Sequence, residues 1–397
     1  MHPPESAGAG DLRPEDVSSL FAELLGREAS SRDIEIWMAA GSLRALIEGI
    51  LGSEEYRARS AAASRSRSAP GSTYLNSWVP GLEQFTRPPG ELSPDGVAIV
   101  GEQGHLFIYG GSNDNVRSHR GEVQMGAGWL DSWRSLTDER HEQAARAGRT
   151  LAFAVVPEKL AVYEDAFPQD LTPSGPRPVT RLLQAGLPLV YPQESLRAVR
   201  ADGESYLRTD SHLTVPGNRT MALEVLAALG VAASALPELE LGAPYLTPGD
   251  LGSHFDPPVL GEVRLVSTPS RARIISDNRA QVEAVGGHIG TVRVFRNEDA
   301  ADGRMVALFG DSYGFGDPAY QGLSWFLAQV FREVHFLWVP CGWDPAYMDH
   351  VGASLVVCQS AERFIGRVPA RAVDIRALAL ETVTRRAALG EGRAFSD

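Results

Sequence analysis

The sequence has 397 residues, 43% of them hydrophobic and 22% charged, a composition that is ordinary for a globular protein with one large domain and a small one beside it. Its net charge of −13 argues against nucleic acid and anionic membranes as general partners, because both would repel it, but leaves a sugar possible. The two cysteines, Cys341 and Cys358, are too few for a disulfide framework, so we expect buried, reduced thiols.

The N-terminal sequence carries no recognisable targeting signal. Residues 1–17 lack the basic and apolar regions of a signal peptide. No stretch of the chain approaches the roughly 18 consecutive apolar residues that a membrane span requires. We therefore expect a cytoplasmic protein without a membrane span, with the periplasm as the alternative location.

Residues 14–60 are predicted to form a small three-helix module. Apolar residues recur there at helical spacing in three stretches, separated by Gly26 and by the pair Gly41 and Ser42, where helices are expected to stop. The LLGR turn, Trp37 and the closing SEEY resemble a helical module found beside bacterial glycosyltransferases and other carbohydrate-modifying enzymes. The resemblance implies a docking or spacer unit, and hence a protein partner, with no chemistry of its own.

Residues 57–75 follow this module and are predicted to be a flexible linker. They are rich in Ser, Ala, Arg, Pro and Gly, which do not build a core. Their arginines lack interleaved aromatic residues, so a solvated tether is favoured over a nucleic-acid patch.

Residues 90–370 are predicted to form one α/β domain. Apolar runs typical of buried strands alternate with segments of helical spacing, such as the helix expected between Pro216 and Gly230. This alternation predicts a mostly parallel sheet with helices on both faces and an active site at the carboxyl ends of its strands. The clearest strand-like runs of this domain lie at 149–159, 186–192, 304–310, 333–340 and 353–359.

Residues 371–397 are predicted to form a C-terminal helix and tail.

Ser312 is the candidate nucleophile. The apolar run Met305–Phe309 leads directly into Gly310, Asp311 and Ser312, and a helix is predicted over Pro318–Phe331. Ser312 would then lie at the tip of a strand-to-helix turn, near free backbone N–H groups that can stabilise an oxyanion. The alternative is that Asp311 and Ser312 only satisfy backbone groups of the turn, as such residues often do.

Asp210 and His212 are the candidate orienter and base. In an extended segment, residues two apart point to the same side, so Asp210 can accept a hydrogen bond from Nδ1 of His212 and leave Nε2 to face a serine. The alternative is a helix cap made by Thr214 or the aspartate, with a histidine at the surface. No further ligands appear at metal-binding spacing, so no metal is predicted.

The FGDSY stretch around Ser312 resembles the first block of the SGNH (GDSL) hydrolases. In most of that superfamily the Asp and His follow the serine in a DxxH, whereas here they precede it, an order similar to the permuted, alginate O-acetyltransferase-like branch. This sequence departs from that branch at Leu213, where a tryptophan is usual, which alters the expected acceptor-side wall of the pocket. Further stretches that resemble the branch, over roughly 95–368, are GEQGHLFIYGG, VPEKLAVY, TDSHLTVPG and ERF.

The resemblance implies an SGNH-like parallel sheet and a Ser312–His212–Asp210 triad. It implies an O-acetyltransferase that acts on a bacterial sugar or exopolysaccharide through an acyl-serine. No bound cofactor is expected, and the acetyl donor is acetyl-CoA or an acetylated carrier. Two alternatives stay open: a carbohydrate O-acetylesterase with the same triad, and a non-catalytic polysaccharide-assembly protein.

Further residues are candidates for the oxyanion site and for substrate binding. The oxyanion candidates are the Tyr313 and Gly314 backbone and the loop side chains Ser112 and Asn113, although Asn in a Gly-rich turn often serves the turn alone. A solvated lysine is the commoner role for Lys159, and an ion pair with Glu362 is favoured for Arg363. Trp325 is expected in the core, while Trp338 and Trp343 could line a sugar platform. The substrate-binding candidates are thus Lys159, Arg363 and Trp343.

Overall fold

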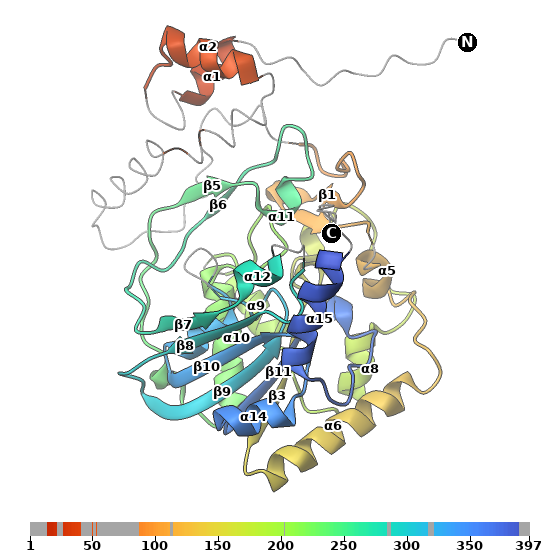
Figure 1. Ribbon diagram of the computed structural model, residues 1–397. Helices are drawn as coiled ribbons and strands as arrows, with labels where there is room; N and C mark the ends of the chain where they lie inside the picture. Colours follow the sequence, from red (N-terminus) through yellow and green to blue (C-terminus); the bar gives the residue numbers. More distant parts are fainter. Residues whose placement is uncertain are drawn as a thin grey trace.

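The computed structural model describes residues 14–21, 27–40, 50, 53, 87–111, 114–201, 203–283, 287–316 and 321–388. Two helices, α1 (Pro14–Leu20) and α2 (Ser31–Ala40), fall within the predicted N-terminal module (Figure 1). The third predicted helix lies outside the described residues except for Ile50 and Ser53, and the predicted linker at 57–75 lies wholly outside them. The three-helix module therefore stays a prediction.

The centre of the molecule is a seven-stranded sheet with the order β4-β3-β11-β9-β10-β8-β7 (Figure 1). The pairs from β4 to β10 are all parallel, whereas β8 and β7 pair in antiparallel fashion at one edge. The predicted mostly parallel sheet is confirmed, and the antiparallel edge is an addition to it. The strands are β3 (Thr150–Val156), β4 (Leu189–Val190), β7 (Arg273–Asp277), β8 (Val292–Arg296), β9 (Asp302–Gly310), β10 (Phe331–Trp338) and β11 (Leu355–Ala361).

Two small antiparallel ribbons lie apart from the central sheet. The first pairs β1 (Ala98–Val100) with β2 (Leu106–Ile108), and the second pairs β5 (Tyr245–Thr247) with β6 (Gly261–Val263). The glycine-rich opening stretch of the α/β region therefore forms a hairpin and contributes no strand to the central sheet.

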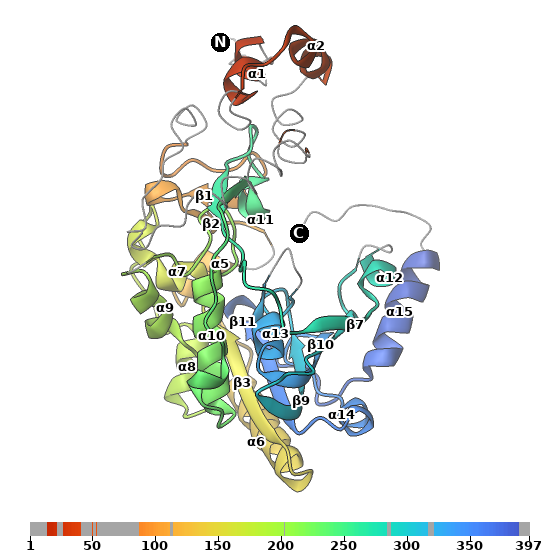
Figure 2. The ribbon, with the colours of Figure 1, turned by 90° about the vertical axis from the view of Figure 1, so that its left-hand side faces the viewer.

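Helices cover both faces of the sheet, as predicted. Successive residues of a strand point to opposite faces, so Ala152 and Ala154 of β3 pack in one core cluster, while Leu151 and Phe153 pack in the other. Figure 2 shows α10 on one side of the strands, with α14 and α15 on the other. The first face carries α7 (Lys159–Val162), α9 (Gln193–Val199), α10 (Val215–Ala228) and α13 (Leu323–Ala328). The second carries α6 (Trp129–Arg146), α8 (Pro178–Gln184), α14 (Pro345–Val351) and α15 (Ile375–Ala388).

The remaining helical segments are short. None of the helices in the described part of the chain is long and apolar enough to cross a bilayer. The short segments are η3 (Glu102–Gly104), α5 (Asn115–His119), η4 (Glu164–Ala166), η5 (Ala233–Ala235), α11 (Gly249–Gly252), α12 (Arg279–Glu283) and η6 (Glu362–Phe364).

Both cysteines are buried free thiols in the second core cluster, as predicted.

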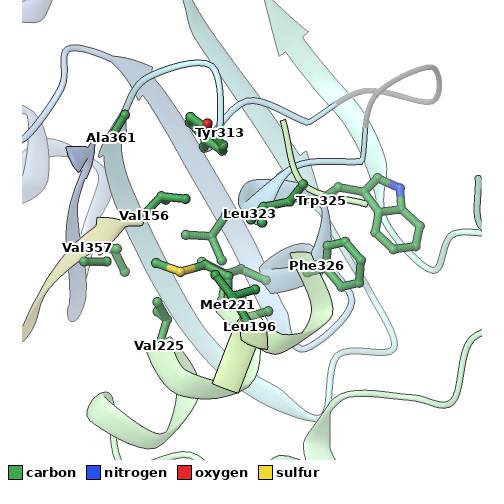
Figure 3. Close-up of a cluster of buried hydrophobic side chains, with 14 of the residues drawn as sticks. Val156, Leu196, Met221, Val225, Tyr313, Leu323, Trp325, Phe326, Val357 and Ala361 are labelled. Carbon is green, nitrogen blue, oxygen red and sulfur yellow. The ribbon is translucent and has the colours of Figure 1, made fainter. Parts of the chain in front are cut away.

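The first core cluster reaches from α10 to the end of β9 (Figure 3). Met221 and Val225 of α10 pack against Val156 and Val357 of the sheet. Trp325 belongs to this cluster, as predicted, and so does Tyr313. Each fully buried apolar side chain contributes about 2 kcal/mol of burial free energy. The turn that carries Ser312 is therefore anchored in the core through its neighbour Tyr313.

The helix predicted over 318–331 is much shorter than expected. The described helix α13 ends at Ala328, and Phe331 already opens β10, while residues 317–320 lie outside the described part. Val330, just before β10, and Phe331, its first residue, are both fully buried. Apolar residues at such a junction fit the period of a helix as well as that of a strand, so their pattern did not reveal the boundary.

Candidate active site

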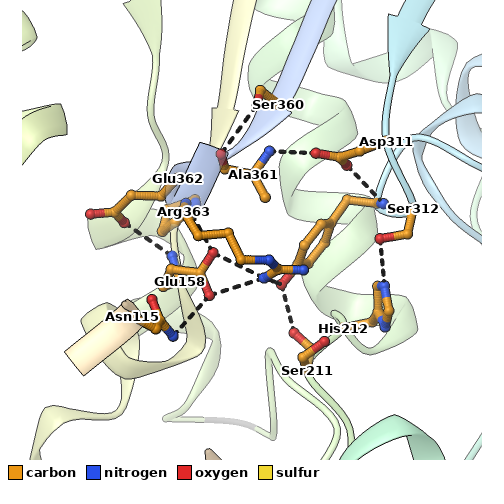
Figure 4. A network of polar contacts seen from close by, with 12 residues as sticks. Asn115, Glu158, Ser211, His212, Asp311, Ser312, Ser360, Ala361, Glu362 and Arg363 are labelled. Carbon is orange, nitrogen blue, oxygen red and sulfur yellow. Dashed lines mark hydrogen bonds and ion pairs between the residues drawn. The ribbon is translucent and has the colours of Figure 1, made fainter. Parts of the chain in front are cut away.

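Asp311 builds the turn that presents Ser312 at the carboxyl end of β9. Oδ1 of its carboxylate accepts hydrogen bonds from the backbone N–H of Tyr313 at 3.1 Å and from Nε2 of Gln359 at 2.7 Å. Oδ2 accepts one from the backbone N–H of Ala361 at 2.6 Å. The turn interpretation thus applies to Asp311 and leaves the Ser312 hydroxyl available for another partner (Figure 4).

Glycine is required on either side of this turn because Gln359 passes so close. A Cβ atom on Gly310 would lie 2.4 Å from Oε1 of Gln359, and one on Gly314 would lie 2.7 Å from the same atom. Both distances are well inside van der Waals contact. The glycines around Asp311 and Ser312 therefore leave room for the Gln359 side chain that reaches the turn from β11.

The structure brings Asp210, His212 and Ser312 together. Nε2 of His212 lies 2.8 Å from Oγ of Ser312, and Nδ1 lies 2.7 Å from Oδ1 of Asp210. Thr214 also caps α10, accepting the backbone N–H of Gly217 at 3.2 Å. The structure therefore has both the helix cap and the Asp-His pair, which the sequence offered as alternatives. Thr214 caps the helix, while Asp210 and His212, just before the cap, form the hydrogen bonds that lead to Ser312.

The charges around His212 raise its pKa above the ordinary value for histidine, so they favour the protonated imidazole. Burial raises the pKa of Asp210, but the charge of His212 and its hydrogen bonds outweigh burial and hold that pKa well below its usual range. Burial lowers the pKa of His212, but the Asp210 charge and hydrogen bond and the charge of Asp250 outweigh it, so the net shift is upward. A base of this kind takes up a proton readily.

Asp250, at the start of α11, is a site residue that the sequence analysis missed. Its Oδ2 lies 3.6 Å from Nδ1 of His212, and its Oδ1 accepts the backbone N–H of Ser211 at 2.6 Å. In the sequence it stands in Pro248-Gly249-Asp250, which reads as an ordinary turn, and no local signal distinguishes it. Asp210, His212 and Asp250 each place one possible metal ligand within 4.8 Å of the others, but these atoms are already hydrogen-bonded within the site.

Lys159 is the single lysine of the sequence, and it is neither solvated nor placed to meet a substrate. Its Nζ donates to the backbone carbonyls of Leu207 at 2.6 Å, Arg208 at 2.7 Å and Asp210 at 3.2 Å. Burial lowers its pKa to about 7, against the opposing charges of carboxylates led by Asp210. The prediction that Lys159 binds substrate is therefore wrong. An ammonium has three N–H groups, which match the three carbonyls, and Lys159 thereby holds the loop that carries Asp210.

Arg363 forms its ion pair with Glu158 and not with its neighbour Glu362. Its Nη1 lies 3.0 and 3.1 Å from the two carboxylate oxygens of Glu158 and 3.4 Å from the Tyr313 hydroxyl. Glu362 instead accepts hydrogen bonds from Arg177 at 3.1 Å and from the Tyr191 hydroxyl at 2.7 Å. Figure 4 shows the Arg363 guanidinium between Glu158 and the Ser312–His212 pair, so Arg363 remains a candidate for contact with substrate.

The backbone groups proposed for the oxyanion are already engaged. The Tyr313 N–H donates to the Asp311 side chain, and the Gly314 N–H donates to the Asp311 carbonyl at 2.9 Å. The N-terminus of α13 is not at Ser312 either, because the helix begins only at Leu323. Within the described residues the N–H of Ser312 itself has no acceptor. Ser112 and Asn113 lie outside the described part of the chain.

Trp343 does not line a sugar platform. Its side chain is 1% exposed in the second core cluster, and its Nε1 donates to Oε1 of Gln143 on α6 at 2.6 Å. This places it in the core on the α6 side of the sheet. Trp338, at the end of β10, is only partly buried and stacks on the ring of His288 with a centroid distance of 4.7 Å.

Comparison with known proteins gives a family and several similar structures. Residues 100–348 match the family described as ALGX: SGNH hydrolase-like domain, acetyltransferase AlgX. No curated protein sequence matches the chain.

Three solved structures illustrate the similarity. The O-acetyltransferase domain of Pseudomonas putida AlgJ is 15% identical, with 75% of this chain and 100% of that chain covered and a TM-score of 0.45. Bacillus cereus PatB1 with a sulfonyl adduct is 13% identical, with 71% and 98% covered and a TM-score of 0.44. Pseudomonas aeruginosa AlgX is 13% identical, with 71% and 65% covered and a TM-score of 0.38.

Proposed function

The chain belongs to the AlgX family of SGNH hydrolase-like acetyltransferases, and from that premise we propose that Ser312 carries an acetyl group to a hydroxyl of a bacterial sugar or exopolysaccharide. The observation that supports this role is the hydrogen-bonded series from Asp210 through His212 to Ser312, with distances of 2.7 and 2.8 Å. A serine hydroxyl is a poor nucleophile by itself, and an oriented histidine beside it supplies the base that it needs.

The reaction has two half-reactions that use His212 in the same way. In the first, Oγ of Ser312 bonds to the acetyl carbonyl carbon while Nε2 of His212 takes the hydroxyl proton. The bond to the donor's leaving group then breaks, and His212 gives that group the proton. In the second, a sugar hydroxyl attacks the acetyl-serine and gives its proton to His212, which returns it to Ser312 as the ester bond to the enzyme breaks.

We propose two hydrogen-bond donors that stabilise the negative charge on the oxygen of the tetrahedral intermediate. The first is the backbone N–H of Ser312, which has no acceptor within the described residues. The second is Arg363, because all its side-chain hydrogen bonds to described residues use Nη1. Fixed donors of this kind stabilise charge that develops in the transition state without having to reorganise.

The acceptor and the donor are part of our proposal, which the family membership supports only as far as acetyl transfer. A bacterial glycan is the proposed acceptor, and acetyl-CoA or an acetylated carrier is the proposed donor. Removal of acetyl groups by the same triad is the second candidate, because water can replace the sugar in the second half-reaction. A non-catalytic role in polysaccharide assembly is the third.

The proposal is tested by intact-mass analysis of the wild-type protein and of Ser312→Ala after incubation with p-nitrophenyl acetate. We expect a mass gain of one acetyl group in the wild type and none in Ser312→Ala, with nitrophenol release that follows the adduct. Adding glycans then separates the first two candidates, since a transferase yields acetylated glycan in competition with hydrolysis. Absence of both adduct and Ser312-dependent release would favour the non-catalytic role.

A further inference from the structure

We propose that Asp250 is a positioning residue for acyl transfer, a second carboxylate that holds the His212 loop in place and stabilises the imidazolium formed when His212 takes the serine proton. The inference rests on the proposed function of Ser312 and His212. It concerns a residue that lies outside the Asp210-x-His212 motif and 38 positions beyond His212 in the chain.

Asp250 contacts each of the three consecutive residues Asp210, Ser211 and His212. Its backbone N–H donates to Oδ2 of Asp210 at 2.9 Å. Its carboxylate accepts the backbone N–H of Ser211 at 2.6 Å and also accepts the Ser211 hydroxyl. Its Oδ2 lies 3.6 Å from Nδ1 of His212. One residue thus orients the Asp210 carboxylate and restrains the backbone on which His212 stands.

The backbone around Asp250 is built to dock against this loop. The N–H groups of Leu251 and Gly252 both donate to the carbonyl of Thr209, at 3.2 and 2.9 Å. Gly249 has φ +63°, and a Cβ there would lie 2.6 Å from the Thr209 carbonyl oxygen. Only glycine fits such a conformation at such a distance. The position of the Asp250 carboxylate is therefore determined by the fold of α11 and not by a flexible surface loop.

The charges that face His212 explain why a second carboxylate is useful. Among the described residues that face His212, Asp210 and Asp250 are acidic, Arg363 is positive and opposes protonation of His212, and Ser312 and the Tyr313 ring are uncharged. When His212 becomes a cation, Arg363 destabilises it and each carboxylate stabilises it. Asp210 provides the direct hydrogen bond, and Asp250 adds charge at 3.6 Å.

The test compares Asp250→Asn with Asp95→Asn by the pH dependence of kcat/KM for p-nitrophenyl acetate. The amide of Asp250→Asn keeps an oxygen to accept the Ser211 N–H but removes the charge. Asp95 is a matched control, since its side chain is 46% exposed against 40% for Asp250 and it bonds Nδ1 of another histidine, His254, at 2.6 Å. We expect Asp250→Asn to lower kcat/KM about tenfold and to move the acid limb roughly 0.5–1 pH unit lower, and Asp95→Asn to change neither.

Two further measurements keep the test decisive. Titration of the His212 imidazole by NMR needs no turnover, so it tests the charge effect even if the wild type forms no Ser312 adduct and the proposed function fails. If Asp250→Asn does not fold, Asp250→Glu replaces it: a displaced carboxylate should lower kcat/KM several-fold. An unchanged acid limb and an unchanged His212 titration in Asp250→Asn, or wild-type kcat/KM in Asp250→Glu, would overturn the inference.

Discussion

Asp311 and Gln359 are joined by two reciprocal hydrogen bonds at the ends of neighbouring strands. The backbone N–H of Asp311 donates to Oε1 of Gln359 at 3.0 Å, and Nε2 of Gln359 donates to Oδ1 of Asp311 at 2.7 Å. Both residues are buried. The turn that carries Ser312 at the end of β9 is therefore held by β11, which lies beside β9 in the sheet but far along the chain.

Replacing Gln359 with Leu should destabilise the protein and slow acylation of Ser312. The change leaves the Asp311 N–H without its acceptor and takes one donor from its buried carboxylate, at a cost of about 1–3 kcal/mol for each buried group left unpaired. Urea unfolding and the rate of acetyl-serine formation measure the two effects. The exposed Gln281 offers a control in Gln281→Leu. Wild-type stability in Gln359→Leu would contradict the argument.

Activity should fall as the pH drops through the pKa of His212. The neutral imidazole is the base, and the net effect of its neighbours raises its pKa above the ordinary value of 6.5. The acid limb of kcat/KM is therefore expected above pH 6.5. Asp210→Asn removes the carboxylate that raises the pKa of His212 most, so the limb should move to lower pH and the rate should fall about 10⁴-fold. A limb well below pH 6.5 in the wild type would show that another group controls the rate.

Replacing Lys159 with Met should unfold or loosen the loop that carries Asp210. Three partly buried carbonyls lose the Nζ donor, and within the described residues only that of Arg208 keeps another, the backbone N–H of Leu106. We expect a loss of about 2–4 kcal/mol in the free energy of unfolding together with loss of activity. Lys159→Arg keeps the charge, but a planar guanidinium does not reproduce three donors on one atom, so partial recovery at most is expected. Thermal unfolding of both variants measures this.

The single lysine also allows a chemical check. Because Lys159 is 3% exposed, its amine should resist reductive methylation in the folded protein and react only after unfolding. Mass analysis of tryptic or other proteolytic peptides reads this directly. Rapid methylation of Lys159 in the native protein would mean that the ammonium is accessible.

Replacing Arg363 with Met should lower kcat for p-nitrophenyl acetate by about 10²-fold or more, with a smaller change in KM, if its guanidinium meets the oxyanion. Arg177→Met is the matched control, because Arg177 forms an ion pair with the buried Glu362 at 3.1 Å, as Arg363 does with Glu158 at 3.0 Å. Both variants leave a buried carboxylate with fewer donors, so comparable losses of stability are expected. An equal loss of kcat in both would assign Arg363 a structural role only.

Local features of this protein could be predicted from the sequence alone. The helix α10 has its cap at Thr214 and Gly230 just after its end at φ +71°, because capping depends on residues within one turn. The alternation of buried strands and helices predicted the mostly parallel sheet. The candidate site was also predictable from short stretches of sequence. The turn at Ser312 and the pair Asp210 and His212 each involve a few consecutive residues, whose side-chain directions follow from the local backbone.

Only the tertiary structure decided which partners the charged and aromatic side chains take. Glu362 and Arg363 are neighbours in the sequence, yet one binds Arg177 and the other Glu158. Lys159 and Trp343 were expected to meet solvent or sugar and are buried, and Asp250 comes beside His212 because α11 docks on the loop of Thr209. A hydrogen bond requires two atoms to lie about 3 Å apart, and such distances arise between segments that the fold brings together, whatever their separation along the chain.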